Sequence, residues 1–235
     1  MTHEVRYKLA LEYAEKLARE LQKNLVCCCL YGSTSRGTDT KWSDLELFVV
    51  TKEKIPSRSF LVEMIPVSLQ TITEKKLVEK LENPDKDWPF YGGLIKNLEV
   101  LSGNKEAPKK YFEKAMSVPE EKCVETLKNN ISEFVFESCG RIFSCIARKN
   151  YDDIYCAVIE TILEMRTALC LLNHSFVNRD YFGGIKETFR FKKIPKNYPI
   201  LATRLWRSHD PIEIVRYARE LLNNYVNLLK EEWII

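Results

Sequence analysis

Apolar positions in the first hundred residues predict an alternation of helices and strands. They recur at helical spacing over residues 3–23, with charged residues between them, which predicts an amphipathic helix. Two short continuous apolar runs follow, at 25–31 and 45–51, and such runs are typical of strands buried on both faces. A third strand is expected at 60–67, where Pro66 favours an edge or an end position. The other elements expected here are a helix over 73–81, a short helix over 88–96 and a strand over 98–101.

Beyond about residue 111 the strand patterns stop and only helical periods remain. The expected helices cover residues 120–149, 152–172, 178–189, 199–207 and 211–232. Pro119 precedes the first of them, and Asp210 and Pro211 supply an N-cap and a first-turn proline for the last. Consecutive helices joined by short loops are typical of a bundle. The pattern therefore predicts an α+β chain, with a mixed sheet and helices in residues 1–112 and a helical bundle in residues 113–235.

The composition removes several classes of protein. Lys and Arg total 36 against 33 Asp and Glu, and a net charge of +3 argues against a nucleic-acid coat protein or a polybasic membrane binder. No apolar run reaches the ~18 residues that span a bilayer, and the charged N-terminal segment lacks a signal-peptide core. We therefore expect a cytoplasmic protein without a membrane partner. Its cysteines are then reduced thiols, and because they form no CxxC pair we expect no zinc site.

The chemically informative segment begins where the first apolar strand ends. Gly32 allows the backbone to turn sharply and to approach a ligand closely. The residues after it can begin a short helix with outward N–H groups, and Ser33 and Arg36 add side-chain donors. This combination predicts a phosphate-binding turn. It is not the P-loop of ATPases, because no Gly-Lys-Ser or Gly-Lys-Thr follows.

Two acidic residues stand at the start of the next predicted strand. Asp44 and Glu46 are separated by two positions, so their side chains project from the same face. Neighbouring carboxylates repel each other unless a cation lies between them. Mg²⁺ binds such pairs together with substrate phosphates. The alternative, two acids on a solvated strand face, does not explain why the pair follows a phosphate-binding turn.

The sequence from Gly32 to Glu46 has the spacing Gly-Ser-x-x-Arg-x-Thr-Asp-x-x-x-Ser-Asp-x-Glu. It resembles the signature of the polymerase-beta-like nucleotidyltransferases, and within them the chain is most similar to the kanamycin, or aminoglycoside, nucleotidyltransferases. Other similar segments are Val62-Glu63-Met64, Asp87-Trp88-Pro89 and Phe136-Glu137-Ser138-Cys139-Gly140-Arg141. The resemblance implies that residues 1–112 form a polymerase-beta-like nucleotidyltransferase domain and that residues 113–235 form the helical bundle domain of that branch.

The resemblance also implies roles for residues outside the signature. Glu137 matches the family's catalytic base, and Arg141 matches a cationic residue that is lysine in the kanamycin enzymes. Glu63 matches a strand residue that brings a third carboxylate to the metal or the acceptor, and we expect Glu133 to bind substrate with it. Glu133, Glu137 and Arg141 are spaced to share one helix face, which is also the pattern of a plain ion-paired surface. Asp39 also matches the signature, and we expect it to brace the loop.

These features predict the transfer of a nucleoside monophosphate from a triphosphate to a hydroxyl group, with release of pyrophosphate. Asp44 and Glu46 would hold Mg²⁺, the turn after Gly32 would hold the phosphates, and Glu137 would accept the hydroxyl proton. The resemblance implies ATP as the nucleotide. It also implies a homodimer in which the cleft between subunits forms the active site.

Three hypotheses remain open for what receives the nucleotide. The first is a small molecule such as an aminoglycoside, whose positive charge suits the acids Glu63, Glu133, Asp85 and Asp87. The second is a partner protein, as in the adenylylating nucleotidyltransferases of toxin–antitoxin pairs. The third is a regulator that binds a nucleotide without catalysis, against which the intact carboxylates argue. A nucleic-acid partner is not expected, because the chain has no basic and aromatic stripe.

Overall fold

The computed structural model describes residues 2–235, which divide into two compact units. The sheet unit contains the chain up to Asn83 together with Tyr91–Val118. The helical unit contains Pro84–Phe90 together with Pro119–Ile235. Helix α4 (Trp88–Lys96) therefore contributes residues to both units.

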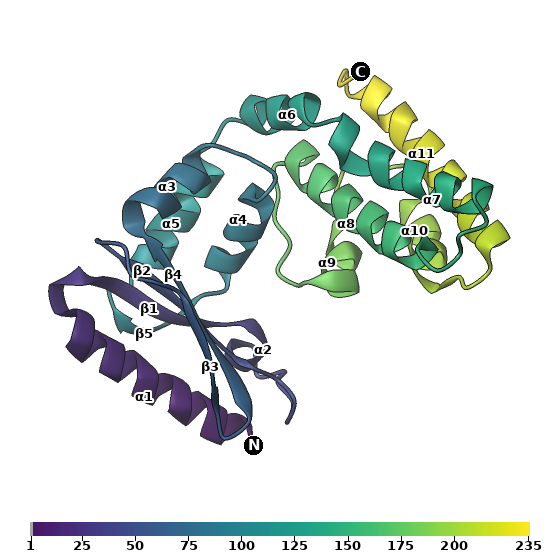
Figure 1. Cartoon of the computed structure of the whole chain (residues 1–235). Helices are drawn as coiled ribbons and strands as arrows, with labels where there is room; N and C mark the ends of the chain where they lie inside the picture. The colour runs from purple at the N-terminus through teal and green to yellow at the C-terminus, as the bar shows by residue number, and fades with distance from the viewer. Residues whose placement is uncertain (1) are drawn as a thin grey trace. The chain divides into compact units, whose positions relative to one another are not determined.

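The sheet unit is built on a mixed sheet of five strands (Figure 1). The strands are β1 (Leu25–Tyr31), β2 (Leu45–Thr51), β3 (Arg58–Val62), β4 (Ile65–Thr73) and β5 (Glu99–Gly103). Their order is β3-β4-β2-β1-β5, in which β2 and β4 are parallel and all other neighbours are antiparallel. The two most apolar strands, β1 and β2, thus lie side by side at the centre, where both faces are covered.

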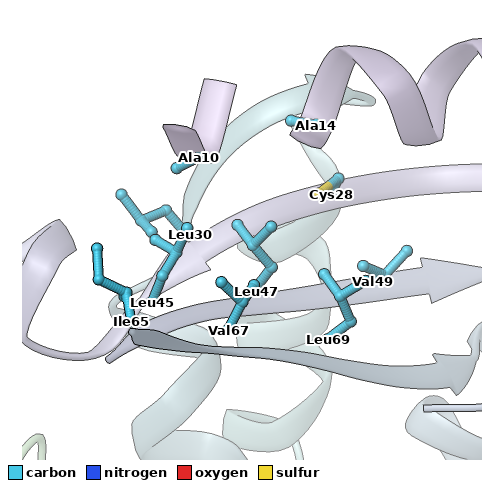
Figure 2. Packing of buried hydrophobic residues seen from close by; sticks show 10 residues of the cluster. All are labelled: Ala10, Ala14, Cys28, Leu30, Leu45, Leu47, Val49, Ile65, Val67 and Leu69. Atoms are coloured by element: carbon cyan, nitrogen blue, oxygen red, sulfur yellow. The ribbon is translucent and has the colours of Figure 1, made fainter. Parts of the chain in front are cut away.

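Helix α1 (His3–Leu21) covers one face of this sheet. Ala10 and Ala14 are fully buried, and their small side chains allow the helix to lie close to the strands. Side chains from β1, β2 and β4 meet them (Figure 2), namely Cys28, Leu30, Leu45, Leu47, Val49, Ile65, Val67 and Leu69. Because side chains alternate along a strand, Glu46 and Phe48 project from the opposite face.

The opposite face is covered by helices α3 (Glu74–Glu82) and α5 (Ala107–Met116) (Figure 1). The Tyr111 hydroxyl donates a 2.7 Å hydrogen bond to Glu74 Oε1 and so joins these two helices. The three consecutive cysteines of β1 are buried free thiols that alternate between the two faces. Burial raises the pKa of Cys28 to about 12, which keeps it protonated at neutral pH. The expected fold class, α+β with a mixed sheet first and helices afterwards, is confirmed.

The predicted strand over 60–67 is wrong, because these residues form a hairpin. Val62 of β3 pairs with Ile65 of β4, so Glu63 and Met64 make a two-residue turn. Both have positive φ, 48° and 68°, as the tight turn of a twisted hairpin requires. Such turns usually contain Asn or Gly, and their absence here concealed the turn in the sequence.

The helical unit consists of helices joined by short connections. They are α6 (Glu120–Asn129), η2 (Ser132–Phe136), α7 (Glu137–Ala147), α8 (Ile154–Leu172), α9 (Tyr181–Thr188), α10 (Tyr198–Arg207) and α11 (Pro211–Glu231). Helix α8 packs against α6, α7, α9 and α10, and α11 packs against α7 and α10. Within residues 2–235, no helix is both long enough and apolar enough to cross a bilayer.

The single helix predicted over 120–149 is also wrong, because the chain breaks between α6 and α7. Phe134 has an extended ψ of 108°, and Val135 has a φ of 76°. A β-branched residue with positive φ is a genuine outlier, so other contacts must stabilise the break. The helix α5 was not predicted at all, since its residues fall where the sequence suggested a boundary.

Trp88 anchors the start of α4 in the helical unit. Its side chain is fully buried, and its ring stacks on His174 at a centroid distance of 5.5 Å. Phe176 lies against the same indole at 4.4 Å. A large aromatic side chain enclosed in this way contributes several kcal/mol, roughly 3–5, relative to alanine.

A buried ion pair ties helix α1 to the loop that precedes β2. The Arg6 guanidinium donates to Asp39 Oδ2 and, over 2.9 Å, to the Thr40 carbonyl. His3 Nδ1 lies 2.6 Å from the other oxygen of Asp39. Burial alone would raise the pKa of Asp39, but the hydrogen bonds from His3 and Arg6 hold the pKa below its ordinary value. Asp39 thus braces the signature loop.

We expect Arg6→Met to destabilise the sheet unit by about 3–5 kcal/mol, because it leaves the Asp39 carboxylate buried without its cation. The side chains of Arg6 and Asp39 are 0% and 1% exposed. The control is Lys8→Met on the same helix, where the lysine is 78% exposed and pairs only loosely with Glu12 at 3.9 Å. Urea unfolding at neutral pH measures both variants.

The pH dependence checks the same pair. Because the folded state lowers the pKa of Asp39, the pair stabilises the fold above the ordinary pKa of an aspartate. That contribution should vanish as the pH falls through the lowered pKa, so wild type and Arg6→Met should converge in acid. Similar stabilities for Arg6→Met and Lys8→Met at neutral pH would contradict this role.

Candidate functional site

The predicted phosphate-binding turn follows β1 directly. Gly32 has a φ of +75° and begins the short helix α2 (Gly32–Ser35). The turn is closed by a 3.0 Å hydrogen bond from the Thr38 N–H to the Ser33 carbonyl. Within residues 2–235, neither the Ser33 hydroxyl nor the Arg36 guanidinium forms a hydrogen bond or ion pair. Both donors therefore remain available to a ligand.

Glu46 lies directly against this turn. It is the cross-strand partner of Tyr31, the last residue of β1. A Cβ atom placed on Gly32 would overlap with Glu46 Oε2, so only glycine allows the carboxylate this close to the backbone. The sheet thus brings the expected metal-binding acid to the phosphate-binding turn.

Asp44 and Glu46 fit the chemistry of magnesium binding. Asp44 is exposed and immediately precedes β2. Glu46 is the second residue of that strand and is half-buried. Within the described part of the chain, no group of three or more His, Cys, Asp or Glu side chains is arranged to hold a metal. Mg²⁺ commonly uses one or two carboxylates and completes its shell with phosphate oxygens and water. Two acids beside a predicted phosphate-binding turn match that requirement.

The third carboxylate expected from the resemblance does not stand within a strand. Glu63 is exposed in the turn between β3 and β4. The β4 residue paired with Glu46 is Ser68, which is uncharged. Glu46 therefore has a hydroxyl, rather than a carboxylate, beside it on the neighbouring parallel strand. A role for Glu63 in binding substrate stays a prediction.

A second group of charged residues lies in the helical unit, at the start of α7. Arg141 donates a 2.6 Å hydrogen bond to Glu137 Oε1. Its other terminal nitrogen contacts both carboxylate oxygens of Glu160, at 2.6 and 2.5 Å. Hydrogen bonds from Arg141 to Glu160 and then to Glu137 raise the pKa of the guanidinium. Arg141 therefore holds two acids, one of which was not predicted.

Glu164 supports the chain break that precedes Glu137. The Val135 N–H donates a 3.0 Å hydrogen bond to Glu164 Oε2, and the Ser138 hydroxyl donates to the same oxygen at 2.5 Å. Burial raises the pKa of Glu164, although these two donors oppose the shift. The carboxylate thus satisfies a backbone group that the break removes from the helix.

The break separates Glu133 from the helix face that it was expected to share with Glu137 and Arg141. Glu133 lies before the distorted residues 134 and 135, so the i, i+4 spacing does not hold there. It instead lines a cavity of about 220 Å³ in the helical unit. The other lining residues are Lys86, Asp87, Phe134, Leu163, Glu164, Arg166 and Thr167. Whether Glu133 binds substrate stays a prediction.

The two acids that sequence reasoning missed, Glu160 and Glu164, share one face of helix α8. They are four positions apart in a mostly apolar helix whose other charged residue is Arg166, and this spacing by itself indicates only proximity to each other. Their partners on α7 and η2 are brought to them by helix packing. The recurrence of an acidic residue at this spacing among apolar positions was the one feature of the sequence that could have identified Glu160 and Glu164.

No protein-family model matches the chain. Two curated relatives are similar to it, both named aminoglycoside nucleotidyltransferase (4'). The relative from a Bacillus species is 26% identical over 143 residues, and the one from Staphylococcus aureus is 25% identical over the same length. Each match covers 60% of this chain and 56% of the relative, so the chain spans little more than half the length of these proteins.

Solved structures with a similar fold include a nucleotidyltransferase-like protein. It is the nucleotidyltransferase-like protein from Exiguobacterium sibiricum 255-15, with a TM-score of 0.53 and 13% sequence identity. The match covers 94% of this chain and 75% of that chain. The likeness shows that the fold of this chain is similar to that of the nucleotidyltransferase-like protein.

The contact between Gly32 and Glu46 predicts unequal effects of alanine at two nearby glycines. Gly32 and Gly37 both have positive φ, but an added Cβ at Gly37 would meet nothing within 4 Å. Gly37→Ala should cost only the backbone strain, about 1–2 kcal/mol. Gly32→Ala should cost slightly more, because the flexible end of the Glu46 side chain must also move. Urea unfolding compares the two variants, and a smaller loss in Gly32→Ala than in Gly37→Ala would contradict the contact.

Glu164 offers a second test. Glu164→Ala should destabilise the helical unit by about 1–3 kcal/mol, because the Val135 N–H is left buried without an acceptor. Glu164→Gln keeps an acceptor and serves as the control. The raised pKa means that Glu164 stabilises the fold most in acid and loses that contribution as the pH rises through the raised pKa. The free energy of unfolding of Glu164→Gln should therefore rise relative to that of the wild type as the pH goes from acid to neutral. Equal stabilities of the alanine and glutamine variants throughout would contradict the role of Glu164.

Proposed function

Because the chain is a distant homologue of the aminoglycoside nucleotidyltransferases, we propose that it is a Mg²⁺-dependent nucleotidyltransferase of the EC 2.7.7 class. It transfers AMP from ATP to a hydroxyl group of a small molecule and releases pyrophosphate. The observation that carries this proposal is the position of Glu46 against Gly32, which joins a metal-binding acid to a phosphate-binding turn.

In this proposal the sheet unit binds the nucleotide. Ser33, Arg36 and backbone N–H groups after Gly32 hold the β- and γ-phosphates, and within residues 2–235 the Ser33 hydroxyl and the Arg36 guanidinium form no hydrogen bond or ion pair. Asp44 and Glu46 hold Mg²⁺ by their carboxylate oxygens. The ion, when bound, neutralises charge on the triphosphate and on the departing pyrophosphate.

The reaction exchanges one P–O bond for another. The acceptor oxygen attacks the α-phosphorus, the bond from that phosphorus to the bridging oxygen breaks, and pyrophosphate departs on the opposite side. Glu137 accepts the proton of the attacking hydroxyl. Its carboxylate is 57% exposed, so it can reach a ligand without leaving a buried site.

Arg141 differs from the role that the resemblance implies. Its guanidinium contacts two carboxylates, and Glu160 occupies one terminal nitrogen with both oxygens. A phosphate group would have to displace Glu160 before it could bind there. We therefore propose that Arg141 orients Glu137 and meets phosphate charge only after this exchange.

The resemblance also supports a homodimer that forms the active site between its subunits, and a division into domains 1–112 and 113–235. The names of the curated relatives make an aminoglycoside the reference acceptor. Glu63 and Glu133 are the acids proposed to contact the acceptor.

Asp44→Asn should abolish Mg²⁺-dependent release of pyrophosphate from ATP while the protein stays folded, because it removes one of two repelling acids. Glu137→Gln should lower kcat by about 10²–10⁴-fold with little change in the KM for ATP. Labelled ATP with an aminoglycoside panel, and with water as the slow acceptor, measures both variants.

The matched controls are Asp152→Asn, an exposed acid outside the site, and Glu213→Gln, which pairs with Arg216 as Glu137 pairs with Arg141. Both should keep wild-type rates. Full activity in Asp44→Asn would refute the proposed function. An unchanged rate in Glu137→Gln, with Asp44→Asn inactive, would remove only the base assignment.

A further inference from the structure

A cationic pocket lies beside the proposed metal site in the sheet unit. It encloses about 780 Å³, which is a volume typical of small-molecule sites. Four basic residues line it, Lys54, Arg58, Lys76 and Lys80, and its lining contains no Asp or Glu. Hydroxyl groups of Ser57, Ser59, Ser68 and Thr73 also line it. Such a lining favours an anion and opposes a polycation.

The sheet register connects this pocket to Glu46. Ser68 of β4 is the partner of Glu46 on one side and of Ser59 on the other. Paired residues project from the same face of a sheet, so Ser59, Ser68 and Glu46 form one row. Both serines line the pocket. The pocket therefore begins one strand away from the carboxylate.

The phosphate-binding turn lies on the other side of Glu46. That turn follows β1, whereas the pocket is built on β4 and β3, and β2 with its acids runs between them. In-line displacement needs the leaving pyrophosphate and the attacking hydroxyl on opposite sides of the α-phosphorus. With pyrophosphate held at the β1 side, the attacking group enters from the side of the pocket.

The rim of the pocket is held in place before any ligand arrives. Thr71 donates from its N–H to Ser57 Oγ at 3.0 Å and from its hydroxyl to the Ile55 carbonyl at 2.8 Å. On the other wall, the Lys80 ammonium lies 4.9 Å from the centre of the Tyr91 ring. Within residues 2–235, Lys54, Arg58 and Lys76 form no ion pair. Their charges are not neutralised by the protein.

We propose that the acceptor is a small hydroxylated compound that carries a phosphate group, and that this pocket binds the phosphate. The proposal rests on the proposed nucleotidyl transfer and names its substrate class. The acceptor's hydroxyl attacks the α-phosphorus as described above, while Lys54 and Lys76 hold its phosphate away from the reaction centre. An aminoglycoside, which is a polycation, is disfavoured at the same place.

The first experiment offers matched acceptors to the wild-type protein with labelled ATP and Mg²⁺. The panel contains ribose phosphate, glycerol phosphate and glucose phosphate, their three dephosphorylated counterparts, kanamycin and a short oligoribonucleotide. We expect kcat/KM for at least one phosphorylated compound to exceed that of its dephosphorylated counterpart by about 10- to 100-fold, which corresponds to one or two charge-assisted hydrogen bonds.

Every other outcome overturns the proposal. Equal or better transfer to kanamycin or to the dephosphorylated compounds would show that the pocket does not select for phosphate. Transfer to the oligoribonucleotide alone would replace the small molecule with a nucleic acid. Absence of transfer to all phosphorylated compounds would reject the substrate class.

The second experiment assigns the selectivity to the pocket. In Lys54→Gln combined with Lys76→Gln, the preference for the phosphorylated compound should fall by about 10-fold or more. The control is Lys75→Gln, an exposed neighbour on α3 that does not line the pocket, and it should keep the preference. An unchanged preference in the double variant would overturn the site. Loss of all transfer in Asp44→Asn tests the nucleotidyl transfer separately, since that variant leaves the pocket intact.

Discussion

The carboxylate of Glu46 lies against the Cα atom of Gly32, and the arrangement of the candidate site in the sheet unit depends on this close approach. It is possible only because β1 and β2 pair directly, so that the last residue of one strand meets the second residue of the other. The loop that connects β1 to β2 must therefore leave the pairing of the two strands undisturbed. Asp39 in that loop is fastened to α1 by Arg6, which fixes the loop from outside the sheet. The segment from Gly32 to Glu46 therefore combines a flexible glycine, a fixed loop and a carboxylate placed by strand pairing.

In the helical unit, a strained break in a helix determines where the charged residues Glu137 and Arg141 lie. Val135 has positive φ, and the backbone there is held by Glu164 from the neighbouring helix. Strain of this kind persists only where surrounding contacts impose it. Its effect is that Glu137 begins a new helix, with its direction set by packing against α8 and not by the residues before it. Arg141, one turn later, then links Glu137 to α8 through Glu160.

The sequence was sufficient for features that local chemistry determines. The apolar runs identified β1 and β2, and the spacing from Gly32 to Glu46 identified the turn and its acids. Features that depend on distant pairing could not be predicted. The parallel pairing of β2 with β4 brings Ser68 beside Glu46, and no local pattern encodes that neighbour. The Glu63 turn and the break at Val135 were missed because neither contains the glycine or proline that usually marks such a conformation.

The pair formed by Arg6 and Asp39 also bears on how such chains diverge. Loss of either partner alone strands a charge in the interior, whereas replacing both with apolar residues of similar volume can be neutral. Selection should therefore preserve or remove the two residues together, so that they covary although 33 positions separate them. The aspartate of the signature would then carry information about the fold and not about the reaction. A basic residue at this distance before the motif becomes a marker for recognising relatives whose catalytic residues have drifted.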